Sequence, residues 1–138
     1  MKQLVALSAA VILAFSVTAC KTDEHALRDN SAMLLSAKEV KEIFVGNTVT
    51  ASTGDTFYFD RGGAAVGKGS YGDKNRGNWN ITSEGQLCLS NWNSSFSPSA
   101  CYKVFFDNAT QQRKLIDING DMKYLIINVV TGNPNNFN

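Results

Sequence analysis

The sequence predicts a mainly β protein: a small antiparallel up-and-down β-barrel of about eight strands, preceded by one short N-terminal helix. Two observations lead to this fold class. From Asn47 onward, apolar residues recur at every second position over short runs, which is the period of a strand with one buried face. Gly, Asn and Asp separate these runs at close intervals, so the connections are short and neighbouring strands should pair in antiparallel order.

Residues 1–19 are typical of a signal peptide. The apolar run over 4–17 is too short to span a bilayer about 30 Å thick. Val17-Thr18-Ala19-Cys20 resembles a lipobox, in which the cysteine is acylated, so we expect a lipid anchor at Cys20. An ordinary cleaved signal peptide and a retained anchor are the alternatives. Lys21 stands where Asp would favour the inner membrane, which indicates an outer-membrane lipoprotein facing the periplasm or the cell surface.

The remaining chain divides into three parts. The polar segment 20–35 is expected to be a lipidated tether that holds the domain away from the membrane. The β-barrel domain is expected over 36–131, and the Asn-rich residues 132–138 are expected to form a disordered tail. Removing 1–19 leaves 119 residues, which is enough for one hydrophobic core.

The first element of the domain is a helix over 37–45. Ser36 and Glu39 form a capping box, in which each side chain accepts from a free amide of the other residue. Gly46 is a natural C-terminal stop. Three apolar residues share one helical face and should point into the core. These residues are Val40, Ile43 and Phe44.

Eight strands follow the helix. Asn119-Gly120, between the last two, predicts a type I′ hairpin turn. The expected strands cover 48–51, 56–59, 64–70, 77–82, 86–91, 100–106, 113–118 and 121–130.

Composition excludes several classes of partner and site. Acidic and basic side chains balance once residues 1–19 are removed, and no basic stripe occurs, which argues against nucleic-acid binding. The only histidine, His25, lies in the tether, so the domain has no Ser-His triad. We expect no metal site and no cofactor.

Cys88 and Cys101 are expected to form a disulfide. Both belong to an exported protein, where an oxidising compartment favours pairing. Each cysteine alternates with inward apolar neighbours, so both should lie on the outer face of adjacent strands, across the hairpin loop over 92–99.

Five aromatic residues on inward faces are candidates to line a ligand site. A barrel of about eight strands is just wide enough either to be filled by side chains or to hold one small ligand, and the sequence leaves both possibilities open. These residues are Phe57, Phe59, Trp79, Tyr102 and Phe106.

A characteristic pattern runs from Leu35 to Phe106. It comprises Leu-Ser-Ala-Lys-Glu-Val-Lys-Glu-Ile-Phe-Val-Gly-Asn-Thr-Val, Phe-Tyr-Phe-Asp, Gly-Asn-Trp, Gly-Gln-Leu-Cys-Leu and Cys-Tyr, with Trp79, Cys88 and Cys101-Tyr102 as its most specific part. The pattern resembles short exported proteins that are common in alphaproteobacteria and known only as a domain of unknown function. This resemblance implies a β domain with a disulfide and no known activity. A looser similarity, in architecture and compartment, is to small-barrel lipoproteins that inhibit proteases in Gram-negative envelopes.

We therefore expect a non-enzymatic binding, accessory or inhibitor protein of the cell envelope. Its expected partners are the membrane, through the lipid anchor, and another envelope protein. Two alternatives remain: a carrier of a small apolar ligand in the barrel interior, and a hydrolase that uses paired carboxylates. The carboxylates available for the second alternative are Asp60, Asp73, Asp107, Asp117 and Asp121.

Overall fold

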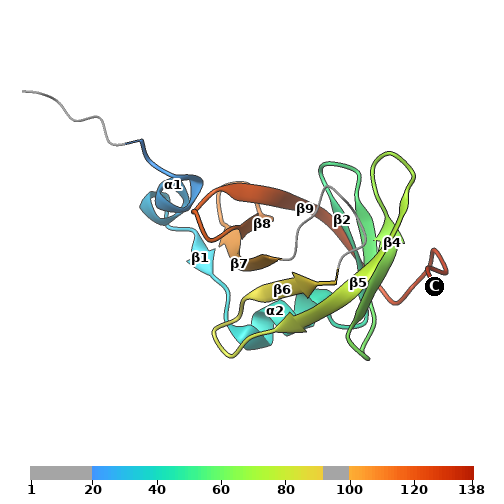
Figure 1. Ribbon diagram of the computed structural model, residues 1–138. Coiled ribbons are helices and arrows are strands. Elements are labelled where there is room, and N and C mark those ends of the chain that lie inside the picture. The colour runs from blue at the N-terminus through green and yellow to red at the C-terminus, as the bar shows by residue number, and fades with distance from the viewer. Residues whose placement is uncertain (1–19, 92–99) are drawn as a thin grey trace, which may run out of the picture.

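The structure is a computed structural model that describes residues 20–91 and 100–138. Eight antiparallel strands form a closed barrel (Figure 1). Each strand pairs with the next one in the chain, and the last pairs with the first to close the ring. The predicted fold class is confirmed, and each predicted strand is present with ends shifted by a few residues. The strands are β2 (Asn47–Ala51), β3 (Thr56–Phe59), β4 (Ala64–Lys68), β5 (Lys74–Ile81), β6 (Leu87–Ser90), β7 (Ala100–Asp107), β8 (Gln112–Ile116) and β9 (Met122–Thr131).

Helix α2 (Ala37–Phe44) covers one end of the barrel, which we call the closed end (Figure 1). The predicted capping box is confirmed: the Ser36 amide donates to Glu39 Oε2 over 2.8 Å, and the Glu39 amide donates to Ser36 Oγ over 3.4 Å. Phe44 is almost fully buried, and its ring packs edge-on against Phe59 with 5.0 Å between the centroids. The helix therefore closes the barrel with its apolar face.

The main core lies between α2 and the barrel strands. Complete burial of one large apolar side chain stabilises a fold by roughly 1.5–3 kcal/mol. The most deeply buried side chains of the core include Val40, Phe44, Leu87 and Val104.

At the opposite end, which we call the mouth, no described helix covers the barrel. Because successive strands run in opposite directions, the connections that follow β2, β4 and β8 lie at the same end. These connections hold residues 52–55, 69–73 and 117–121, and each of them borders the internal space described below.

The connection between β8 and β9 differs from the predicted type I′ turn. Such a turn needs positive φ at both central residues, but only Gly120 has it, at +85°. The Asp117 amide donates to the Asp121 carbonyl over 2.9 Å, and the Gly120 amide donates to the Asp117 carbonyl over 3.1 Å. The hairpin is thus one residue wider than predicted, with Ile118, Asn119 and Gly120 at its tip.

The segment expected to be a tether is folded onto the outside of the barrel. Thr22 caps helix α1 (Asp23–Asp29), where its Oγ1 accepts from the His25 amide over 3.3 Å. Leu27, on the buried face of this helix, packs with Phe105 and Ile116 on the outer surface of β7 and β8. Strand β1 (Met33–Leu34) then pairs with the second half of β7. One helix was expected near the N-terminus, and the structure has two.

Local hydrogen bonds occur within the C-terminal residues 132–138, which the sequence predicts to be a disordered tail. Asn133 Nδ2 donates to the Phe137 carbonyl over 2.7 Å, and the Phe137 amide donates to Asn133 Oδ1 over 2.9 Å. Asn makes such local bonds readily, so a polar, Asn-rich segment can be ordered without burial.

The predicted signal peptide and the hairpin loop over 92–99 lie outside the described residues. Within the described ranges, no helix is long and apolar enough to cross a membrane.

Candidate ligand-binding cavity

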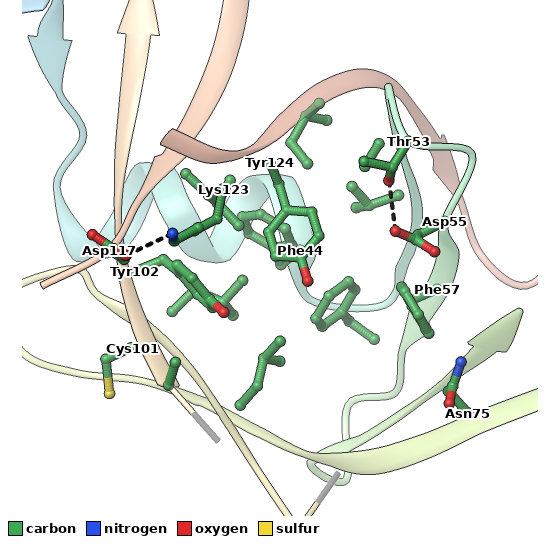
Figure 2. A pocket seen from close by; sticks show the side chains of 18 of the residues that line it. Phe44, Thr53, Asp55, Phe57, Asn75, Cys101, Tyr102, Asp117, Lys123 and Tyr124 are labelled. Carbon is green, nitrogen blue, oxygen red and sulfur yellow. Dashed lines mark hydrogen bonds and ion pairs between the residues drawn. The ribbon is translucent and has the colours of Figure 1, made fainter. Parts of the chain in front are cut away.

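The described side chains leave a cavity of about 1140 Å³ in the barrel interior, which extends from the mouth towards α2. Figure 2 shows aromatic side chains around this space, with α2 behind them. Small-molecule sites typically occupy roughly 300–1000 Å³ and are lined mainly by apolar and aromatic groups. The interior is therefore large enough for a small ligand and has the lining typical of such a site. Its apolar walls include Phe44, Val49, Phe57, Leu87, Tyr102 and Ile126.

Three of the five predicted lining residues border the cavity. Phe57 and Phe59 project from β3, and Tyr102 projects from β7 on the opposite side of the barrel. Tyr102 and Phe59 are buried, whereas Phe57 is half-buried and lies closer to the mouth (Figure 2).

The other two predicted residues do not line the cavity. Trp79 packs against Phe59 with 6.0 Å between ring centroids, and its indole Nε1 donates over 2.9 Å to the carbonyl of Asp60, in a turn at the closed end. Phe106 lies near the end of β7 and faces a small depression beside Ile43, where Arg113 lies 5.9 Å from its ring centroid. Both residues are on the predicted face of their strands, but they lie too near the closed end to border the cavity.

Two important lining residues were not among the predicted set. Phe44 was assigned only to the helical core, although its position at the end of α2 brings it to the base of the cavity. Tyr124 of β9 alternates with Ile126, and this alternation is the sequence signal that marks it as inward.

Two tyrosine hydroxyls point into the cavity (Figure 2). The rings of Tyr102 and Tyr124 meet edge-on, with 5.7 Å between centroids. Burial, followed by the nearby Tyr124 and Asp117, raises the pKa of Tyr102 to about 12. This phenol therefore stays neutral at physiological pH and can donate a hydrogen bond to a ligand.

An ion pair lies on one side of the mouth. Lys123 Nζ is 3.2 Å from Asp117 Oδ2, while Asp117 Oδ1 accepts from the amides of Asn119 and Asp121 over 2.9 and 3.0 Å. The hydrogen bond from the Asp121 amide, together with Lys123 and the Asn119 amide, lowers the pKa of Asp117. The carboxylate is thus ionised and fixed at the edge of the cavity.

The carboxylates on the other side of the mouth also have local partners. Asp55 Oδ1 accepts from the Ser70 amide over 2.9 Å, which ties the β2–β3 turn to the β4–β5 turn. Asp73 Oδ2 accepts from Asn75 Nδ2 over 2.8 Å. These groups give the cavity a polar rim around an apolar interior.

The other three predicted carboxylates do not line the cavity. Asp60 accepts from the Gly62 amide over 2.7 Å in the β3–β4 turn. Asp107 pairs with Lys114 over 2.7 Å at the far end of β7, and Asp121 is exposed beside the mouth. In the part of the chain that the structure describes, no group of three His, Cys, Asp or Glu residues is arranged to hold a metal ion.

The predicted disulfide between Cys88 and Cys101 is present. The two residues lie directly opposite each other on β6 and β7, with 4.0 Å between their Cα atoms, slightly below the usual range of about 4.4–6.8 Å. In Figure 2 the Cys101 sulfur points away from the cavity, as predicted. The bond fastens β6 to β7, a ladder of only three paired positions in the cavity wall.

Comparison with known proteins places the chain in one family. No curated protein and no solved structure matches it. The model of a family described as "Protein of unknown function (DUF995)" matches residues 9–117, which include the whole of β2 to β8. The chain therefore belongs to this family.

Proposed function

We propose that this protein is a non-enzymatic, lipid-anchored binding protein of the cell envelope that holds a small, mainly apolar ligand inside its barrel. The observation that carries the proposal is the hollow interior. A barrel of this size can be packed solid by its side chains, yet here the described side chains leave a cavity of about 1140 Å³ that reaches the mouth. A cavity destabilises a fold because the side chains around it lose packing contacts. A barrel that keeps so large a cavity is therefore better suited to hold a ligand than to be as stable as possible.

The arrangement of polar groups indicates the class of ligand. The interior is apolar and aromatic, whereas the hydroxyls of Tyr102 and Tyr124 face the cavity and the Lys123–Asp117 pair borders the mouth. An amphiphile fits this division: its apolar body fills the barrel, and one polar group accepts from a tyrosine hydroxyl or stays at the mouth.

The envelope location is supported by the sequence. The lipobox-like ending at Cys20 and the resemblance to short exported alphaproteobacterial proteins both favour export. Cys20 is exposed at the start of the described chain and is therefore accessible for acylation. Lys21 supports delivery to the outer membrane.

A fluorescent apolar probe tests the binding function. N-phenyl-1-naphthylamine is titrated into protein that begins at Lys21, which retains every described helix and strand. We expect saturable fluorescence with one probe per chain. Ala51 is buried and borders the cavity, so Ala51→Trp should fill part of the space and weaken probe binding at least about tenfold. Val130→Trp, on the exposed face of the neighbouring strand β9, is the matched control and should bind like the unsubstituted protein.

Near-ultraviolet circular dichroism and thermal unfolding establish that each variant is folded. If Ala51→Trp does not fold, Leu89→Trp supplies a second obstruction from the opposite wall. Absence of saturable binding, or equal weakening by the cavity and surface substitutions, would refute a ligand site inside the barrel.

A further inference from the structure

Two apolar side chains are exposed at the rim of the mouth. Ile118, at the tip of the β8–β9 hairpin, is 94% exposed, and Tyr71, in the β4–β5 turn, is 96% exposed. Both border the cavity, and they approach it from different hairpins. Turn tips normally carry polar residues, so a large apolar side chain at each of two tips on opposite sides of the mouth indicates that the rim meets an apolar environment.

The N-terminal segment is attached to the same rim. The Glu24 amide donates to the Gly120 carbonyl over 2.9 Å, and the Met122 amide donates to Asp23 Oδ2 over 2.8 Å. Thr22 lies against Gly120 at the hairpin tip. Cys20 is two residues earlier in the chain and so lies within about 7 Å of Thr22. Helix α1 thus fixes the start of the described chain beside Ile118.

The chain before Cys20 is apolar from Leu4 to Val17. Whether this run is kept or is replaced by acyl groups on Cys20, the element that enters the membrane starts from the position that α1 holds at the rim. The membrane must therefore lie close to the β8–β9 hairpin.

We propose that the mouth of the barrel rests on the membrane surface, with Ile118 and Tyr71 inserted at the level of the lipid headgroups. The partner is the lipid bilayer itself. This inference rests on the membrane anchor proposed above and is independent of what fills the cavity. Amphipathic surfaces that bind in this way bury their apolar side chains about 5–10 Å into the interface.

The charges near the rim indicate how the contact depends on lipid charge. Lys123 pairs with Asp117, Lys103 pairs with Glu24, and Lys21 pairs with Asp29. The exposed Lys68 and Lys74 flank Tyr71, and Asp55, Asp73 and Asp121 balance them around the same rim. The described part of the rim therefore has no excess of positive charge to attract anionic lipid. The contact should therefore form equally well on zwitterionic and anionic vesicles and change little with salt.

Quenching by brominated lipid tests this orientation. The protein is purified from membranes with its anchor and reconstituted into phosphatidylcholine vesicles with or without phosphatidylglycerol, their acyl chains brominated. Ile118→Trp and Tyr71→Trp place a fluorophore on either side of the mouth, and Ser83→Trp, in the exposed β5–β6 turn at the closed end, is the matched control. Relative to the unsubstituted protein, the two rim tryptophans should lose about half of their added fluorescence and the control almost none.

Each outcome decides the proposal. Quenching of both rim positions but not of position 83, on both vesicle types, supports it. Quenching at 118 alone shows a barrel lying on its side, and equal quenching at all three positions or at none shows no mouth-down contact; each of these results overturns it. Protein that fails to float with the vesicles lacks the anchor and overturns the inference with it, whereas naphthylamine binding is measured separately and reports only on the cavity.

Discussion

Asp117 shows how a single side chain sets the geometry of the mouth. Its carboxylate accepts from the amides of Asn119 and Asp121, and it pairs with Lys123. These bonds hold the β8–β9 hairpin in its wide form, which places Ile118 at the tip and brings Gly120 against Thr22. The shape of the hairpin that meets the N-terminal helix is therefore held in part by one ionised group.

The lowered pKa of Asp117 predicts a specific pH dependence of stability. Because the native pKa lies below the ordinary value of 3.8, the charged group stabilises the fold fully above that value. This stabilisation disappears as the pH falls through the lowered native pKa. Asp117→Asn should lower the urea midpoint at pH 7, and the difference from the parent protein should shrink as the pH falls below 4.

Urea unfolding followed by circular dichroism at several pH values measures this difference. Asp121→Asn, an exposed neighbour in the same hairpin, controls for the loss of one charge. A gap between Asp117→Asn and the parent that is independent of pH would contradict the assigned role of the carboxylate.

The aromatic residues show what a strand pattern can predict. Alternation correctly indicates the inward face of β3 and β7, and so identifies Phe57, Phe59 and Tyr102 as lining residues. It does not give the height of a residue along the barrel, because height depends on how far each tilted strand is staggered against its neighbours. Trp79 and Phe106 are on the inward face of their strands but lie near the closed end. Their height is not predictable from the sequence because the stagger of each strand depends on all the strands of the barrel.

At the scale of elements, the sequence predicts helix α2 but not helix α1. Helix α2 carries a capping box and three apolar residues on one face, so its sequence alone predicts it. Helix α1 has seven residues and buries only Leu27. Such a short helix is not stable by itself, and it forms here because the outer surface of β7 and β8 offers Leu27 a site. Sequence periodicity cannot detect a helix that is attached by one buried side chain and a few polar contacts.

The dependence of α1 on Leu27 leads to a prediction. Leu27→Ala removes a buried side chain from the cluster with Phe105 and Ile116, and should lower the free energy of unfolding by about 2 kcal/mol or more. It should also make residues 21–31 more sensitive to limited proteolysis, because the helix loses its attachment. Chemical denaturation and mass mapping of the fragments measure the two effects.

His25→Ala, an exposed change on the same helix, is the matched control and should leave both properties nearly unchanged. Leu27→Ala protein with parental stability and protection would show that α1 is held to the barrel by its hydrogen bonds and ion pairs alone.

At the scale of the whole molecule, the two ends of the barrel differ in structure. The closed end contains α2 with its buried Val40 and Phe44, and the turns near Trp79 and Gly85. The mouth contains the exposed apolar tips, the ion pair of Lys123 and the start of the described chain. A helix covers one end of the barrel, and the surface available for binding lies at the other.

Strand order and closure follow from the sequence because short connections force neighbours to pair, and eight such strands form a ring. Which end α2 would cover is not predictable from Val40, Ile43 and Phe44, since these residues show only that the helix buries one face. The hollow interior is likewise not predictable from the sequence. Aromatic residues can fill a barrel or line it, and the difference depends on how α2 and the strands share the available volume.

The last prediction separates the anchor from the barrel. Cys20 has no contact with the cavity, and every residue that lines the cavity comes after it in the chain. Cys20→Ala should therefore abolish incorporation of labelled fatty acid and move the protein out of the membrane fraction. The released protein should keep the naphthylamine affinity of the parent barrel, because α1 and the strands are unchanged. Cys20→Ser is the matched control for side-chain size, and it should behave in the same way because a serine cannot form the thioether. Unchanged labelling of either variant would show that the anchor is not at Cys20, while release accompanied by lost probe binding would show that the membrane itself maintains the open cavity.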